Sequence, residues 1–155
     1  MESKRRKPLG DELNNCIFCK IITGEAPASI VYEDEICLAF LDIQPVTPGH
    51  VLVVPRQHAI GLAELPSEIG GHLFQVGQKI SAALKMSRIR CEGINFFLAD
   101  GAVAFQTVFH VHLHVIPRFP GDGFRLVFGP DYRNLPDRSD LDRLANDLKI
   151  VLVHE

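Results

Sequence analysis

The chain has 155 residues, 46% of them hydrophobic and 23% charged, which is the composition of a soluble globular protein and a length typical of one domain. Sixteen basic residues against nineteen acidic ones give a net charge of −3, which excludes general electrostatic binding of nucleic acid. No apolar stretch approaches the roughly 20 residues that span a bilayer, and no apolar signal core follows the basic N-terminus, so we expect a cytoplasmic protein with no membrane partner.

The predicted elements follow one another with short connections. In chain order they are a helix within 14–22, a hairpin over 29–42, a loop over 44–49, a strand over 50–55, a helix over 67–86, a strand over 93–98, a loop over 99–104, a strand over 106–117 and a helix from 139. Apolar residues spaced three and four apart predict the helices, and β-branched and aromatic runs predict the strands. Ser67 is expected to cap the long helix. Strands joined by short turns around one long helix predict an α+β fold, in which helices pack on an antiparallel sheet.

The domain boundaries are expected near the two ends of the chain. Residues 1–13 are polar, carry a basic run at 4–7, and are expected to form a disordered tail. Residues 14–119 are expected to form the main domain. Residues 120–155 are rich in Gly, Pro and Asp before the last helix, and we expect them to be an extension that packs on the same domain or at a dimer interface.

Histidine is the one unusual residue in this composition, with seven copies, three of them within five positions. If residues 106–117 form a strand, His110, His112 and His114 share one face, about 6.5–7 Å apart, and the apolar residues between them face the core. Neutral imidazole can act as a nucleophile, a proton carrier or a metal ligand near pH 7. The alternative is an exposed polar face, which strict alternation disfavours. Three ligands in one row converge poorly on a tetrahedral ion, so at most one of them is expected to bind a metal.

The cysteines and the remaining histidines divide into residues with and without a motif. Cys16 and Cys19 form a Cys-x-x-Cys pair, which by itself is compatible with zinc binding, redox chemistry or packing. The residues without a motif are Cys37 and Cys91, expected to be buried or ordinary thiols, and His72 and His154, expected at the surface.

Five sequence blocks, in the same order, resemble those of the histidine triad (HIT) superfamily. They are Cys16-Ile-Phe-Cys-Lys-Ile-Ile22, Tyr32-Glu-Asp-Glu35, Leu38-Ala-Phe-Leu-Asp-Ile43, Pro48-Gly-His-Val-Leu-Val-Val-Pro55 and His110-Val-His-Leu-His-Val-Ile116. The resemblance covers about residues 14–119 and implies a HIT-like fold. It also implies a nucleotide hydrolase or transferase that acts at the α-phosphate through a covalent nucleotidyl-histidine.

The resemblance implies a role for each motif residue. His112 is the expected nucleophile, His114 is expected to contact the phosphate and protonate the leaving group, and His110 and His50 join this network. The residues expected to bind the nucleotide are Thr107 through its hydroxyl, Gln106 through loop backbone, Asp42 through the ribose, and Ile17, Phe18, Ile21, Phe40 and Ile43 around the base, for which a purine is expected.

The resemblance also implies a metal site. Some bacterial members bind zinc with residues that correspond to Cys16, Cys19, His58 and His110, which would form a closed Cys₂His₂ site of the structural type. Such a zinc would fix His110 and thereby the chain that carries the nucleophile.

The sequence departs from the family pattern at two positions. Ala99 replaces an amide residue that contacts the nucleotide in many members, and Phe105 replaces a glycine that precedes the Gln-Ser/Thr-Val segment. We expect a homodimeric hydrolase of nucleoside phosphoramidates or dinucleoside polyphosphates. A nucleotide-binding module with little catalysis, and a nucleotidyltransferase or phosphorylase, remain as alternatives.

Overall fold

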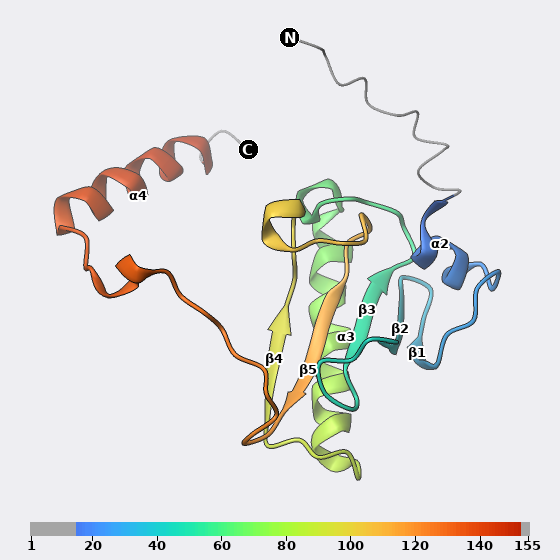
Figure 1. Ribbon diagram of the computed structural model, residues 1–155. Coiled ribbons are helices and arrows are strands. Elements are labelled where there is room, and N and C mark those ends of the chain that lie inside the picture. Colours follow the sequence, from blue (N-terminus) through green and yellow to red (C-terminus); the bar gives the residue numbers. More distant parts are fainter. Residues whose placement is uncertain (1–14, 153–155) are drawn as a thin grey trace. The chain divides into compact units, whose positions relative to one another are not determined.

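The computed structural model describes residues 15–152 (Figure 1), so the predicted tail at 1–13 and His154 lie outside the described residues. The helices are α2 (Ile17–Ile22), α3 (Ser67–Met86) and α4 (Arg138–Leu152), and the strands are β1 (Ile30–Glu33), β2 (Cys37–Leu41), β3 (Val51–Pro55), β4 (Gly93–Phe97) and β5 (Leu113–Arg118). Short 3-10 turns lie at Leu62–Glu64, Ala102–Ala104 and Pro130–Arg133. The described helices include none that is both long and apolar enough to cross a membrane.

The five strands form one sheet in the order β1-β2-β3-β5-β4, and every neighbouring pair is antiparallel. Helix α3 runs along one face of this sheet (Figure 1). Its side chains at three- and four-residue spacing, among them Leu73, Val76 and Ile80, are buried together with Val53 and Leu113 of the sheet. The helix approaches the sheet closely at Gly77, where a Cβ would lie 3.0 Å from Leu113. The predicted α+β fold is therefore confirmed.

The opposite face of the sheet is covered in part by α2. Alternate side chains of a strand point to opposite faces, so Leu52 and Val54 face away from α3 and pack with Phe18 and Phe40 in a second apolar cluster. His114 is paired with Leu52 in the sheet register and therefore belongs to this second face. Helix α3 thus packs on one face of the sheet, and His114 lies on the other face.

Two local predictions are wrong. The strand expected over 106–117 begins at Leu113, because the chain bends at Val108–His110, so His110 and His112 precede the strand. His112 and His114 still line the same cavity, whereas His110 does not. Ser67 does not cap α3: Pro66 occupies the cap position, with φ −52° and ψ 140°, and no side chain caps the helix there. Ser67 is instead the first residue of the helix.

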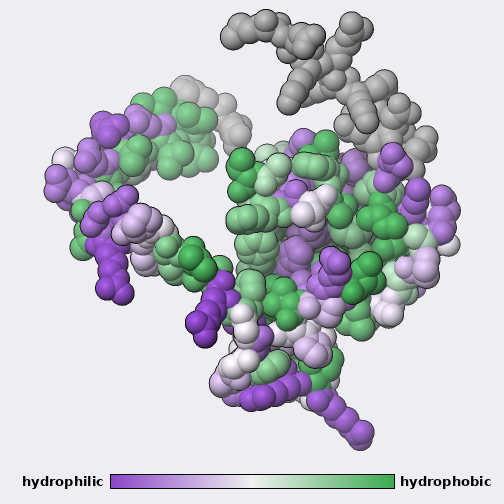
Figure 2. All heavy atoms as spheres, in the orientation of Figure 1, coloured by the Kyte–Doolittle hydropathy of each residue, from purple (hydrophilic) through white to green (hydrophobic). Residues whose placement is uncertain are grey.

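The chain divides into two compact units, which for the described residues are 15–122 and 123–152. In the second unit, α4 carries Leu141, Leu144 and Leu148 along one side, and Figure 2 shows polar and apolar side chains on opposite sides of this helix. Every described residue from 125 onward is exposed, so within the described part this unit has no core of its own. Packing of this extension on the main domain or at a dimer interface stays a prediction.

Candidate active site and metal cluster

A chain of hydrogen bonds connects His50, which directly precedes β3, with His114 on β5. The backbone N–H of Val46 donates to Nδ1 of His50 at 3.1 Å, and Nε2 of His50 lies 2.9 Å from Nδ1 of His114. An amide N–H can only donate, so Nδ1 of His50 accepts and the proton of the neutral ring must be on Nε2. That proton points to Nδ1 of His114, which places the remaining proton of His114 on Nε2. His114 is thereby prepared to donate a hydrogen bond from Nε2.

The orientation of His112 is set by a different bond. Its Nδ1 donates to the backbone carbonyl of His110 at 2.8 Å, so the lone pair of the neutral ring is on Nε2. Burial is the main cause that lowers the pKa of His112 below 6.5, against the opposing effects of that carbonyl and of Asp42. The ring is therefore neutral near pH 7 and can act as a nucleophile. The ring centres of His112 and His114 are 4.7 Å apart.

The neighbouring rings are also neutral. Burial, followed by the nearby His112 and His50, lowers the pKa of His114 to about 3. Burial also lowers the pKa of His50, although Asp42 acts in the opposite direction. Nδ1 of His50 and a carboxylate oxygen of Asp42 are 3.6 Å apart, which is too long for a hydrogen bond between these side chains. The rings of this site are therefore neutral, and Nε2–H of His114 is a donor with a fixed direction.

A second cluster brings together all four residues expected to bind a metal. Their possible ligand atoms lie within 4.8 Å of one another. Nδ1 of His110 lies 3.5 Å from the sulfur of Cys16 and 3.6 Å from that of Cys19, and Nδ1 of His58 lies 3.4 Å from the sulfur of Cys19. The two Nδ1 atoms are 3.2 Å apart. Tetrahedral zinc, with bonds of about 2.3 Å to sulfur and 2.0–2.1 Å to nitrogen, would place its ligands about 3.6 Å apart for S–N pairs and about 3.3 Å for N–N pairs.

The protonation of His110 also fits a metal ligand. Its Nε2 lies 2.9 Å from the carbonyl oxygen of Pro55 and must donate to it, so the lone pair is on Nδ1, the atom that faces the cysteines. His110 is fully buried, and burial is the main cause that lowers its pKa to about 4. The four side chains thus form a closed Cys₂His₂ set whose spacing fits a tetrahedral ion.

A cavity of about 550 Å³ opens beside His112 and His114. The predicted nucleotide-binding residues that line it are Ile17, Phe18, Ile21, Phe40, Asp42, Ile43 and Thr107. One carboxylate oxygen of Asp42 accepts the N–H of Gln44 at 2.9 Å, which is a turn contact, and the other has no hydrogen bond within the described residues. Asp42 therefore combines a turn role with a free acceptor at the cavity.

Gln106 is placed differently from the other predicted residues. It is buried, and its amide nitrogen donates to the carbonyls of Ile60 and Val108, while its amide oxygen accepts the N–H of Gly101. Its backbone N–H donates to the carbonyl of Gly101. The residue cross-links the loop before the histidines and does not line the cavity, so its contribution is to the shape of this loop.

The two departures from the family pattern have opposite environments. Ala99 is buried. Phe105 is 81% exposed and has a φ of 69°, in the left-handed region. This conformation costs a residue with a side chain about 1–2 kcal/mol relative to ordinary backbone. Phe105 thus keeps the conformation that suits a glycine.

Sequence reasoning missed the partners that fix the histidines. The N–H of Val46 and the carbonyl of Pro55 are backbone groups without a sequence signal. The ring of Phe18 contacts His112 edge-on at 5.1 Å between ring centres. The expectation that His72 is a surface residue without a role is also incomplete, because its Nε2 lies 2.7 Å from a carboxylate oxygen of Asp34 in the β1–β2 turn.

The chain belongs to the HIT family, since a family model described as the HIT domain matches residues 23–121. An uncharacterised HIT-like protein of Mycobacterium tuberculosis is 42% identical over 132 residues, which are 85% of this chain and 91% of that protein. An adenylylsulfatase of Arabidopsis thaliana is 39% identical over 105 residues, 68% of this chain and 53% of that protein. The crystal structure of a zinc-bound histidine triad protein of Mycobacterium smegmatis matches with a TM-score of 0.70 at 42% identity, covering 92% of this chain and 99% of that one.

Proposed function

We propose that this protein is a nucleotide hydrolase that acts at the α-phosphate of nucleoside phosphoramidates or dinucleoside polyphosphates. The observation that carries the proposal is the pair of neutral rings at the cavity: His112 has its lone pair on Nε2, and His114 has its proton on Nε2. One ring supplies the nucleophile, and the other supplies a hydrogen-bond donor for the leaving group. The name of one relative, an adenylylsulfatase, supports a nucleotide substrate.

The reaction proceeds in two steps. Nε2 of His112 forms a bond to the α-phosphorus and the bond from phosphorus to the leaving nitrogen or oxygen breaks, while Nε2–H of His114 donates a hydrogen bond to the leaving group, which takes its proton from solvent water. Water then attacks the phosphorus and releases a proton to solvent, and the bond to His112 breaks, which returns the neutral ring. The products are the nucleoside monophosphate and the protonated leaving group.

The cavity residues hold the nucleotide during these steps. The free carboxylate oxygen of Asp42 accepts a ribose hydroxyl, and the hydroxyl of Thr107 donates to the phosphate. The apolar wall around Phe18 and Phe40 contacts the base, for which a purine is proposed. Negative charge grows on the phosphate oxygens in the transition state, so donors already in position stabilise it.

We also propose that Cys16, Cys19, His58 and His110 hold a zinc ion. With four protein ligands, such an ion would be structural and would cross-link the chain segments that carry these residues. The carbonyl of His110 accepts the hydrogen bond that orients His112. Fixing the ring of His110 would therefore also fix the orientation of the nucleophile.

We also propose that the protein forms a homodimer through the edge of the sheet. The outer edge of β4 pairs with no strand among the described residues. Phe96 on β4 is 44% exposed, and together with Phe74 of α3, 48% exposed, it lines a shallow cavity at this edge. An apolar sheet edge of this kind is suited to pairing with a second copy. Sedimentation equilibrium is expected to give a dimer mass, and a monomer at micromolar concentration would contradict this part.

A substrate panel tests the central proposal. Wild-type protein is incubated with adenosine phosphoramidates and diadenosine polyphosphates, and zinc is measured on the same preparation. Trapping by mass spectrometry is expected to find the adenylylated protein, and His112→Ala is expected to abolish both the adduct and turnover. The matched control is His72→Ala, which changes a histidine on α3 outside the cavity and should keep turnover.

Two outcomes would overturn the hydrolase. The absence of adduct and turnover across the panel would indicate a nucleotide-binding module. Product that forms only when inorganic phosphate is added would indicate a phosphorylase-type transferase.

A further inference from the structure

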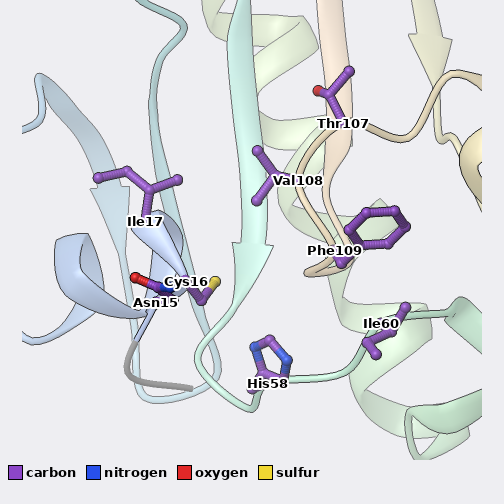
Figure 3. Close-up of a pocket in the computed structure, with 8 residues that line it drawn as sticks. All are labelled: Asn15, Cys16, Ile17, His58, Ile60, Thr107, Val108 and Phe109. Carbon is purple, nitrogen blue, oxygen red and sulfur yellow. The ribbon is translucent and has the colours of Figure 1, made fainter. Parts of the chain in front are cut away.

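A second cavity, of about 690 Å³, adjoins the nucleotide cavity. Figure 3 shows it between the beginning of α2, the segment of His58 and Ile60 after β3, and the segment 107–109 before β5. Thr107 and Val108 line both cavities, and so does Ile17. The two cavities therefore share a boundary at the residue whose hydroxyl is proposed to contact the phosphate.

The arrangement suggests which part of a substrate each cavity takes. His112 and His114 line the nucleotide cavity and not the second one. In a displacement at phosphorus, the leaving group departs on the side opposite to the nucleophile. With the nucleoside in the first cavity and the phosphate at Thr107, the second cavity is open to the group beyond the phosphate. We infer that the second cavity is the binding site for the leaving group, an inference that rests on the proposed function.

The chemistry of the walls selects the class of leaving group. Ile60, Val108, Phe109 and Ile17 make the cavity apolar, and Phe109 and Ile17 are 50% and 45% exposed, so a ligand would remove apolar surface from water. None of the described residues that line it is a lysine or arginine, the side chains that pair with phosphate oxygens. His58 is held in the metal cluster. The cavity thus fits an uncharged apolar substituent better than a second charged phosphate.

The substrate class that follows is a nucleoside phosphoramidate whose amine carries an apolar group. In the first step, Nε2 of His112 bonds to phosphorus, the phosphorus–nitrogen bond breaks, and the amine leaves with a hydrogen bond from Nε2–H of His114 and a proton taken from solvent water. The apolar substituent stays in contact with Phe109 and Ile60 during this step. These two side chains are therefore specificity-determining residues.

The test compares two adenosine phosphoramidates whose amines have similar size, 2-methylpropylamine and 2-aminoethanol. The wild-type protein is expected to have the higher kcat/KM for the apolar amine. Phe109→Ala is expected to lower this value about tenfold and to change that for 2-aminoethanol by less than about twofold. Met86→Ala is the control, because Met86 is 87% exposed at the end of α3 and lines neither cavity.

A second variant gives a gain that misfolding cannot imitate. Ile60→Lys places a cation in the cavity wall and leaves intact the backbone carbonyl of Ile60 that binds Gln106. It is expected to raise kcat/KM for diadenosine triphosphate relative to the 2-methylpropyl phosphoramidate. The leaving-group site is overturned if Phe109→Ala lowers kcat/KM equally for both phosphoramidates. It is also overturned if Ile60→Lys leaves unchanged the ratio of kcat/KM for diadenosine triphosphate to that for the 2-methylpropyl phosphoramidate. Failure of the wild-type protein to cleave any of the three compounds overturns the proposed function instead.

Discussion

Replacing His50 tests the assignment of protons in the active site. His50 is buried and does not line the nucleotide cavity, so it is not expected to touch the substrate. Its Nε2–H donates to Nδ1 of His114 and thereby keeps the proton of His114 on Nε2, where the leaving group needs it. His50→Ala removes that donor. His114 can then carry its proton on Nδ1, in which form its Nε2 cannot donate a hydrogen bond to the leaving group.

The size of the effect follows from the two hydrogen bonds that His50 makes. The bond of 2.9 Å to His114 and the bond of 3.1 Å from Val46 are each expected to contribute about 1 kcal/mol. Loss of the first is expected to lower kcat about tenfold, which corresponds to roughly 1.4 kcal/mol. Loss of both, with the cavity that remains, is expected to lower the free energy of unfolding by about 2–4 kcal/mol.

The assay is steady-state hydrolysis of an adenosine phosphoramidate, with urea denaturation on the same variants. His50→Gln is the matched variant, because its amide N–H₂ can replace the donor to His114. It is expected to recover most of kcat, and KM should change little in either variant. If His50→Gln is as slow as His50→Ala, or if His50→Ala loses no activity, the assignment of protons is refuted.

Three further predictions concern pH, the metal and the loop. Burial lowers the pKa of His112 below 6.5, so the nucleophile stays neutral as the pH falls through 6.5. We therefore expect kcat/KM to stay constant there and to decline only at lower pH. A pH profile that falls at 6.5 contradicts this prediction. Cys19→Ser is expected to lose zinc measured by atomic absorption and to unfold at a lower temperature, whereas Cys91→Ser, whose hydroxyl can keep the bond to the carbonyl of Gly93, should retain the metal. Phe105→Gly is expected to be about 1 kcal/mol more stable to urea than Phe105→Ala, because only glycine relieves the strain at a φ of 69°, and equal stability would refute the strain.

The pattern of residues could predict most of the fold because it is local. Apolar side chains at three- and four-residue spacing predict α3, and the acidic turn between β-branched runs predicts the hairpin of β1 and β2, which the structure confirms. The family and the gathering of Cys16, Cys19 and His58 were also within reach, because whole sequence blocks carry the resemblance. These inferences required only neighbouring residues or a known motif.

Which nitrogen of each histidine carries the proton could not be predicted, because it depends on a backbone partner. For His110 the partner is the carbonyl of Pro55, 55 residues away in the sequence, and for His50 it is the N–H of Val46, four residues away. Neither group differs chemically from any other peptide group, so no residue type marks it as the partner.

The error at the histidine strand has a physical cause that connects the two clusters. Strict alternation predicted three imidazoles on one face of an extended chain, but the chain bends before the strand begins. The bend at Val108–His110 turns its ring toward Cys16 and Cys19, and the same turn brings its carbonyl to Nδ1 of His112. The departure from the strand therefore orients the nucleophile and completes the metal cluster at once, so a change that straightens this segment should impair both.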